Sequence, residues 1–176
     1  MRLFVGLRPS DEFRSALAAL QDRLQAAGVT GRYLDPSNLH MTLAFIGEWP
    51  EDITSVLPSA DRGFTLTLSG IGLFPEAKVL WAGVEASEAL ACLAAKTRSN
   101  LADHGIPFDP KPFNPHFTLI RKPAIPDGLD PAGIEIPAAV MRVEEVCLYR
   151  SDHGKNGMTY TVIGSQAFRD SHGWQP

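Results

Sequence analysis

Cysteine is scarce in this chain, and long apolar runs are absent. Only Cys92 and Cys147 occur among 176 residues, too few for a disulfide framework or a cysteine-based zinc cluster. We expect both thiols to be reduced and buried. No run of about 18 apolar residues is present, so we expect no transmembrane helix. The N-terminal stretch Met1–Leu7 is too short an apolar run for a signal peptide, so we expect a cytoplasmic protein.

Acidic residues outnumber basic ones, and the formal net charge is −4. A protein that binds a long duplex through its phosphates is usually basic over a broad face. The charge therefore argues against such binding, and any nucleic acid would be recognised locally, at one or two nucleotides. The length and the 44% hydrophobic content suit one globular domain with a real core.

The chain contains an internal repeat with an offset of 77 residues. Each copy begins with a short apolar run, Leu3–Leu7 in the first and Leu80–Val84 in the second. A serine follows in a helix N-cap position, with acidic residues in the next turn. Each copy then has apolar residues at helical spacing. A glycine closes each predicted helix as a left-handed cap, and these residues are Ser10, Gly28, Ser87 and Gly105.

After each predicted helix comes a loop with proline, and then a strand that carries a histidine. These segments read Asn38-Leu39-His40-Met41-Thr42-Leu43 and Asn114-Pro115-His116-Phe117-Thr118-Leu119. Further strands are predicted at 64–68, 140–149 and 158–163. The pattern predicts an α+β fold in a single bilobal domain over 1–176. Two pseudo-twofold-related lobes, each an antiparallel or mixed sheet with helices on its outer face, would flank a central groove.

The tetrapeptide pattern His-x-Thr-Leu occurs twice, in register with the repeat. Residues i and i+2 of a strand point to the same face, so His40 lies with Thr42 and His116 with Thr118. A twofold arrangement would bring all four side chains to one cleft. One neutral imidazole could then take a proton from water, while an imidazolium protonates the leaving oxygen of a phosphodiester. The threonine hydroxyls suit the non-bridging phosphate oxygens.

Other interpretations of the histidines are weaker. A lone strand histidine is more often structural than catalytic, but here the motif is duplicated. A shared metal site is disfavoured, because no carboxylate or cysteine accompanies either copy. His104, His153 and His172 have no repeat partner, and we expect them to be structural or solvent-exposed.

These segments resemble the 2H phosphoesterases, specifically the bacterial RNA 2′,3′-cyclic phosphodiesterase group, also called 2′-5′ RNA ligases. The resemblance covers nearly the whole chain and includes Met1–Val5, Leu39–Gly47, Leu80–Val84, Pro115–Arg121 and a strand pair around Tyr160. It implies hydrolysis of an RNA 2′,3′-cyclic phosphate to a 2′-phosphomonoester without metal or cofactor. It also implies that His40 is the general acid and His116 the base, an order that the sequence leaves open. Some members also join or cleave 2′-5′ linkages.

The resemblance further implies that Phe45 and Arg121 sandwich a nucleobase. Their odd offset from the histidines puts them on the opposite strand face unless each strand ends or bulges. Phe45 could instead be a core residue, and Arg121 a surface charge or a phosphate clamp. The expected partner is an RNA 3′ end or a small nucleotide, and the protein is expected to be a monomer. Two alternatives stay open: a non-catalytic nucleotide-binding or RNA-binding 2H protein, and a 2H enzyme for another small cyclic phosphate.

Overall fold

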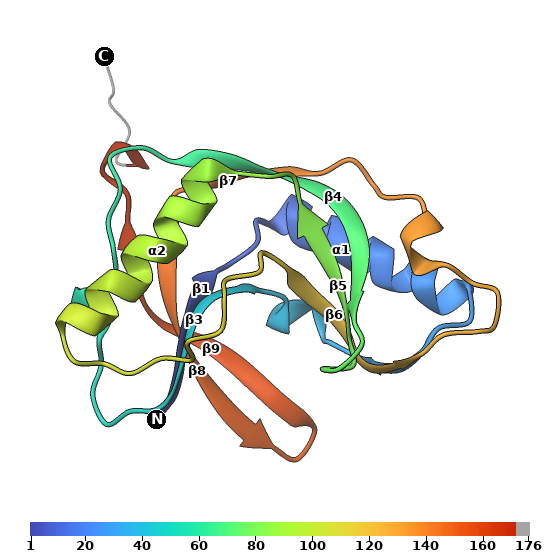
Figure 1. The fold of residues 1–176 in the computed structure, drawn as a ribbon, viewed down its shortest axis with the longest axis horizontal. Helices are drawn as coiled ribbons and strands as arrows, with labels where there is room; N and C mark the ends of the chain where they lie inside the picture. Colours follow the sequence, from blue (N-terminus) through green and yellow to red (C-terminus); the bar gives the residue numbers. More distant parts are fainter. Residues whose placement is uncertain (172–176) are drawn as a thin grey trace.

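The computed structural model describes residues 1–171, which form two antiparallel sheets and two long helices (Figure 1). The helices are α1 (Asp11–Ala26) and α2 (Glu88–Asp103). The first sheet has the order β3-β1-β8-β9, made of Met41–Glu48, Arg2–Leu7, Glu145–Gly154 and Gly157–Ala167. The second has the order β2-β6-β5-β4-β7, made of Thr30–Tyr33, Phe117–Ala124, Val79–Val84, Phe64–Phe74 and Val140–Val143. No helix among these residues has the length and apolarity to cross a membrane.

The repeat predicted from the sequence is confirmed in the secondary structure. Both helices have 16 residues. The first residue of α2 lies 77 positions after the first residue of α1, and the last residues have the same separation. Each helix begins at a serine cap. The Ser10 hydroxyl accepts a hydrogen bond from the Phe13 N–H at 3.2 Å, and the Ser87 hydroxyl accepts one from the Leu90 N–H at 3.1 Å. Strands β1 and β5 are also related by 77 residues, and β3 and β6 by 76.

The ends of the helices follow the same rule. Gly28 and Gly105 have φ angles of 95° and 68°, a left-handed conformation that a glycine adopts without the steric cost of a Cβ. The residue after each glycine donates a backbone hydrogen bond to the last turn of the helix. These bonds run from the Val29 N–H to the Leu24 carbonyl and from the Ile106 N–H to the Leu101 carbonyl. Glycine therefore ends both helices by the mechanism that the sequence predicts.

The lobes do not correspond to the two halves of the sequence. Strand β2 from the first half pairs with β6, whereas β8 and β9 join β1. Each helix lies against the sheet of the other half, α1 against β6 and β7 and α2 against β3 (Figure 1). This exchange of strands between the halves has a physical reason. The strands of one half alone would form only two-stranded sheets, which are marginally stable.

Two local predictions need correction. The run predicted over 140–149 is interrupted at Glu144, where β7 ends and β8 begins, so it contributes to both sheets. Cys147 is buried as expected, but Cys92 is exposed. Leu90 and Leu93 face the core from α2, and Cys92 lies on the solvent side of the same turn.

Candidate active site

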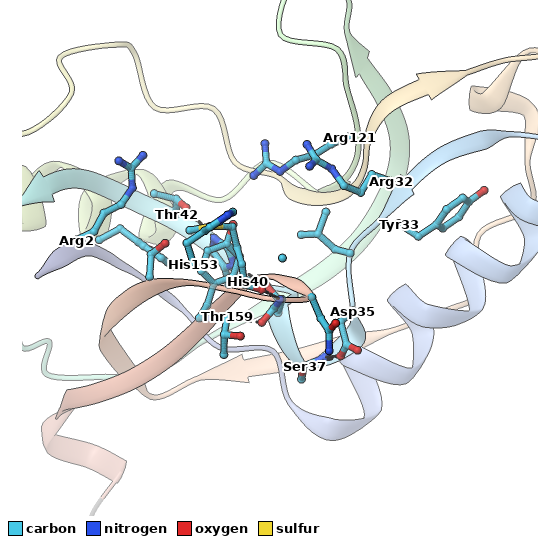
Figure 2. Close-up of a pocket in the computed structure, with 18 of the residues that line it drawn as sticks. Arg2, Arg32, Tyr33, Asp35, Ser37, His40, Thr42, Arg121, His153 and Thr159 are labelled. Carbon is cyan, nitrogen blue, oxygen red and sulfur yellow. Dashed lines mark hydrogen bonds between the residues drawn. The ribbon is translucent and has the colours of Figure 1, made fainter.

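A pocket of about 990 Å³ lies between the two sheets and the hairpin formed by β8 and β9 (Figure 2). His40 and Thr42 line it at the start of β3, and Arg121 lines it from β6. The hairpin contributes His153 and neighbouring residues. Four of the six site residues predicted from the sequence line this pocket, namely His40, Thr42, Phe45 and Arg121. His116 and Thr118 are not among its lining residues.

His40 precedes β3 rather than lying within it, which corrects the predicted strand position. Its Nδ1 is 2.7 Å from the Asn38 carbonyl oxygen. A carbonyl can only accept, so Nδ1 carries the proton and donates it. Nε2 of the neutral ring is then an acceptor, and it lies 3.1 Å from the Thr42 hydroxyl. The shared face predicted for His40 and Thr42 is therefore present.

His116 repeats this arrangement at the start of the second sheet's equivalent strand. It immediately precedes β6, and its Nδ1 donates to the Asn114 carbonyl at 2.6 Å. Both imidazoles are thus held as the same tautomer, each with Nε2 left for chemistry. Thr118 is half-buried in β6, and no hydrogen bond joins it to His116 among the described residues.

Aromatic rings surround both histidines. The centroid of the His40 ring lies 4.6 Å from that of Phe4, 4.9 Å from Tyr160 and 5.5 Å from Tyr149. The rings of Phe74 and Trp81 lie 5.0 Å and 6.3 Å from His116. Phe4 and Trp81 are 77 residues apart, so the repeat also supplies an aromatic neighbour to each histidine.

This enclosure changes the acidity of both rings. Burial, together with the charges of Arg121 and His116, lowers the pKa of His40 to about 4. Burial and the Arg121 charge also lower the pKa of His116. A low-dielectric site disfavours the charged form of an imidazole. Both rings are therefore neutral at pH 7 in the free protein, and Arg121 lies within electrostatic range of the two.

A bulge in each histidine-bearing strand explains how Phe45 and Arg121 reach the pocket. Leu43 in β3 and Leu119 in β6 have no partner in the neighbouring strand. Both are the leucine of a His-x-Thr-Leu motif. An extra residue reverses the alternation of side chains beyond it, so Phe45 and Arg121 return to the face of the motif threonine. The condition stated from the sequence, a bulge after each motif, is met.

Several residues that line the pocket or orient the histidines were not identified from the sequence. Arg2 and Arg32 line the pocket at different ends, and Arg2 lies over the Phe45 ring at 5.0 Å. Asn38 and Asn114 supply the carbonyls that orient the histidines. The signal for these two was available, because an asparagine stands two residues before each motif histidine.

The remaining histidines differ in their surroundings. His104 caps α2 and donates from Nδ1 to the Asn100 carbonyl at 2.8 Å, a structural role as predicted. His153 is exposed as expected but lines the pocket. His172 lies outside the described residues. Within residues 1–171, no group of three or more His, Cys, Asp or Glu side chains is arranged to hold a metal ion.

Comparison with known proteins identifies the family of this chain. The curated RNA 2′,3′-cyclic phosphodiesterase of Thermus thermophilus is 30% identical, with 98% of this chain and 93% of that protein covered. The one from Escherichia coli is 36% identical, with 76% and 77% covered. The crystal structure of apo E. coli LigT superposes with a TM-score of 0.78 at 30% identity, covering 95% of this chain and 96% of that chain. Residues 7–81 and 83–160 match the family described as LigT like phosphoesterase, and the chain belongs to that family.

Proposed function

We propose that this protein is an RNA 2′,3′-cyclic phosphodiesterase that opens the terminal cyclic phosphate to a 2′-phosphomonoester. The observation that carries the proposal is the matched pair of histidines. Each donates from Nδ1 to the carbonyl two residues before it, and the two rings lie within electrostatic range of each other and of Arg121. The names of the curated relatives support the same reaction.

The reaction needs two proton transfers, and two imidazoles can supply both. His116 Nε2 takes a proton from water as the water oxygen bonds to phosphorus. The protonated Nε2 of His40 gives a proton to the 3′ oxygen as the bond from phosphorus to that oxygen breaks. The assignment of His40 as acid and His116 as base follows the family resemblance. No metal ion is required for either transfer in this scheme.

The substrate itself would supply the charge that the acid needs. Burial, with a smaller effect of the Arg121 charge, keeps the pKa of His40 at about 4 in the free protein. A cyclic phosphate is an anion, and an anion beside an imidazole favours its charged form. Substrate binding would therefore raise the pKa of His40 and favour the protonated ring that the free protein disfavours. The hydroxyls of Thr42 and Thr118 would donate to the non-bridging phosphate oxygens.

Phe45 and Arg121 are suited to hold the terminal nucleobase. Both line the pocket, and an aromatic ring with a guanidinium plane can sandwich a base with little sequence preference. E. coli LigT has been crystallised with 3′-AMP, and that structure superposes with a TM-score of 0.77 at 30% identity. This supports a nucleotide ligand for the pocket. Because the residues assigned to both proton transfers lie in one chain, we also propose that the monomer is the active form.

The test is turnover of an oligoribonucleotide that ends in a 2′,3′-cyclic phosphate, in the presence of EDTA. Release of a 2′-phosphate end, abolished by His40→Ala and by His116→Ala, is the expected result. The exposed helix-cap residue provides the control, since His104→Ala should retain activity. Nucleotide binding without turnover would favour a binding protein, and turnover lost in EDTA would contradict the metal-free scheme. Turnover confined to other cyclic phosphates would redirect the substrate assignment.

A further inference from the structure

Two arginines face each other across neighbouring strands at one end of the pocket. Arg32 in β2 and Arg121 in β6 are Cα partners in the antiparallel register. Directly opposite residues project on the same face, with Cβ atoms about 5 Å apart. Both side chains line the pocket, and Figure 2 shows them next to each other, with Tyr33 directed away.

Neither guanidinium has an ion pair or a hydrogen bond within residues 1–171. Asp35 is the acidic residue that lines this end of the pocket, but its carboxylate accepts from the Ser37 N–H at 2.9 Å and the Ser37 hydroxyl at 2.6 Å. Like charges placed directly opposite each other in a sheet are destabilising. A fold that keeps such a pair at the edge of a pocket without a carboxylate partner has a site for an anion.

The position of Arg32 distinguishes this anion from the reacting phosphate. The Arg121 charge acts on both His40 and His116, so Arg121 is near the reacting group. Strand β2 is the edge of the second sheet, beyond β6, and neighbouring strands lie about 4.8 Å apart. Arg32 is therefore one strand further along the pocket and suits the next phosphate of a nucleotide chain.

We propose that Arg32, beside Arg121, binds the phosphate attached to the 5′ oxygen of the terminal nucleoside. The preferred substrate would then be the end of an RNA chain, or a 5′-phosphorylated nucleotide, rather than a free cyclic nucleoside phosphate. The pocket volume of about 990 Å³ lies at the upper end of the range for small-ligand sites and leaves room for this group. The assignment rests on the proposed function and extends it to substrate class.

The sharpest test compares two substrates that differ by this phosphate alone. One is adenosine 2′,3′-cyclic phosphate with a free 5′ hydroxyl, and the other carries a 5′-phosphate. Wild-type protein should give a kcat/KM about tenfold higher for the second, in line with one charge-assisted hydrogen-bonded contact. In Arg32→Gln the ratio of the two values should fall close to one. Exposed Arg62 lies outside the pocket lining, and Arg62→Gln should keep the wild-type ratio.

Other results of this experiment would overturn either the Arg32 assignment or the proposed function. Equal kcat/KM for both substrates in the wild type, or an unchanged ratio in Arg32→Gln, would overturn the assignment while leaving the proposed activity intact. Loss of the preference in Arg2→Gln instead would assign the 5′-phosphate to the opposite end of the pocket and also overturn it. No turnover of either substrate or of an oligonucleotide end would contradict the proposed function itself.

Discussion

Gln21 and Arg98 stand 77 residues apart and hold the two bulges of the histidine-bearing strands. Gln21 in α1 donates to the Leu119 carbonyl of β6 at 3.0 Å. Arg98 in α2 donates to the Leu43 carbonyl of β3 at 3.2 Å. Each helix therefore supports the strand of the other half, at the motif residue whose bulge turns Phe45 or Arg121 toward the pocket.

The first prediction concerns Gln21, which is buried and also donates to the Leu34 carbonyl at 2.8 Å. Gln21→Leu removes both donors while keeping a similar volume. An unsatisfied buried group costs about 1–3 kcal/mol, so the free energy of unfolding in urea should fall by about that amount. We also expect a lower kcat, because the bulge at Leu119 loses its support.

The same helix offers a matched control for this substitution. Gln25 lies one turn further along α1 and is exposed, so Gln25→Leu should change the unfolding free energy by no more than about 0.5 kcal/mol. Equal effects of the two substitutions would contradict a role for the buried amide.

Local signals explain how much of the fold could be predicted from the sequence. Serine caps, apolar spacing and cap glycines act within a few residues, and they gave the limits of α1 and α2 closely. Strand partners and register depend on distant segments, and the repeat does not fix them. Thr42 lies opposite Gly6, whose repeat equivalent is Gly83. Thr118, however, lies opposite Trp81, so the register differs between the two copies.

The same distinction applies to the site. The duplicated motif identified His40 and Thr42 and predicted their shared face, and the structure adds a hydrogen bond between the two side chains. The sequence could state that Phe45 needs a bulge to reach the pocket, but only the strand pairing shows one. Arg32 was not identified, because its significance depends on pairing with Arg121 across two strands far apart in the chain.

A second prediction concerns Asn38, which joins the hairpin to the site. Its side-chain amide donates to the Met158 carbonyl at 2.9 Å and accepts from the Tyr160 N–H at 3.2 Å. Asn38→Ala keeps the backbone carbonyl that orients His40 but removes both links, each worth about 1 kcal/mol. We expect a higher KM and faster hydrogen exchange at the Tyr160 amide.

The repeat supplies the control for Asn38. The backbone carbonyl of Asn114 orients His116 in the same way, but no hydrogen bond of its side chain occurs within residues 1–171. Asn114→Ala should therefore leave KM and the Tyr160 amide exchange close to wild type. Equal changes in the two variants would show that the hairpin link is unimportant.

A third prediction concerns the pH dependence of catalysis. One histidine must be charged and the other neutral, so kcat/KM should be bell-shaped with its maximum between their two pKa values in the free protein. Burial keeps both pKa values below 6.5, that of His40 at about 4, and the maximum should therefore lie below pH 6.5. The kcat profile should reach higher pH, because the bound phosphate favours the imidazolium. A maximum of kcat/KM above pH 7 would contradict the assignment.

A fourth prediction follows from the close approach of Trp81 to Gly72. A Cβ at Gly72 would lie 2.1 Å from the Trp81 ring, and this ring neighbours His116. Gly72→Ala should displace the indole, cost about 1–3 kcal/mol in unfolding free energy, and lower kcat/KM about tenfold or more by moving His116. Gly70 lies in the same strand with open space at its Cβ position, so Gly70→Ala should preserve kcat/KM. Matching losses in both variants would refute the steric link.

The last prediction uses His40 as a probe of folding. Its pKa is about 4 in the folded protein, mainly because burial disfavours the charged ring, against 6.5 for an unperturbed histidine. Above pH 6.5 the ring is neutral in both the folded and the unfolded states and adds no pH dependence. Between pH 6.5 and 4 only the unfolded chain binds the proton, so stability falls as pH falls, by about 1.4 kcal/mol per pH unit and about 3 kcal/mol in all.

The His40 contribution can be measured by urea unfolding at a series of pH values. It is the difference between the unfolding free energies of wild type and His40→Gln. The variant should lose less stability than the wild type on going from pH 6.5 to 4, because it lacks the proton site that only the unfolded chain fills. His104→Gln removes an exposed histidine outside the pocket and should keep the wild-type descent. Parallel curves for wild type and His40→Gln would mean that the ring is not held neutral by the folded site, and would remove the basis for substrate-driven protonation of the acid.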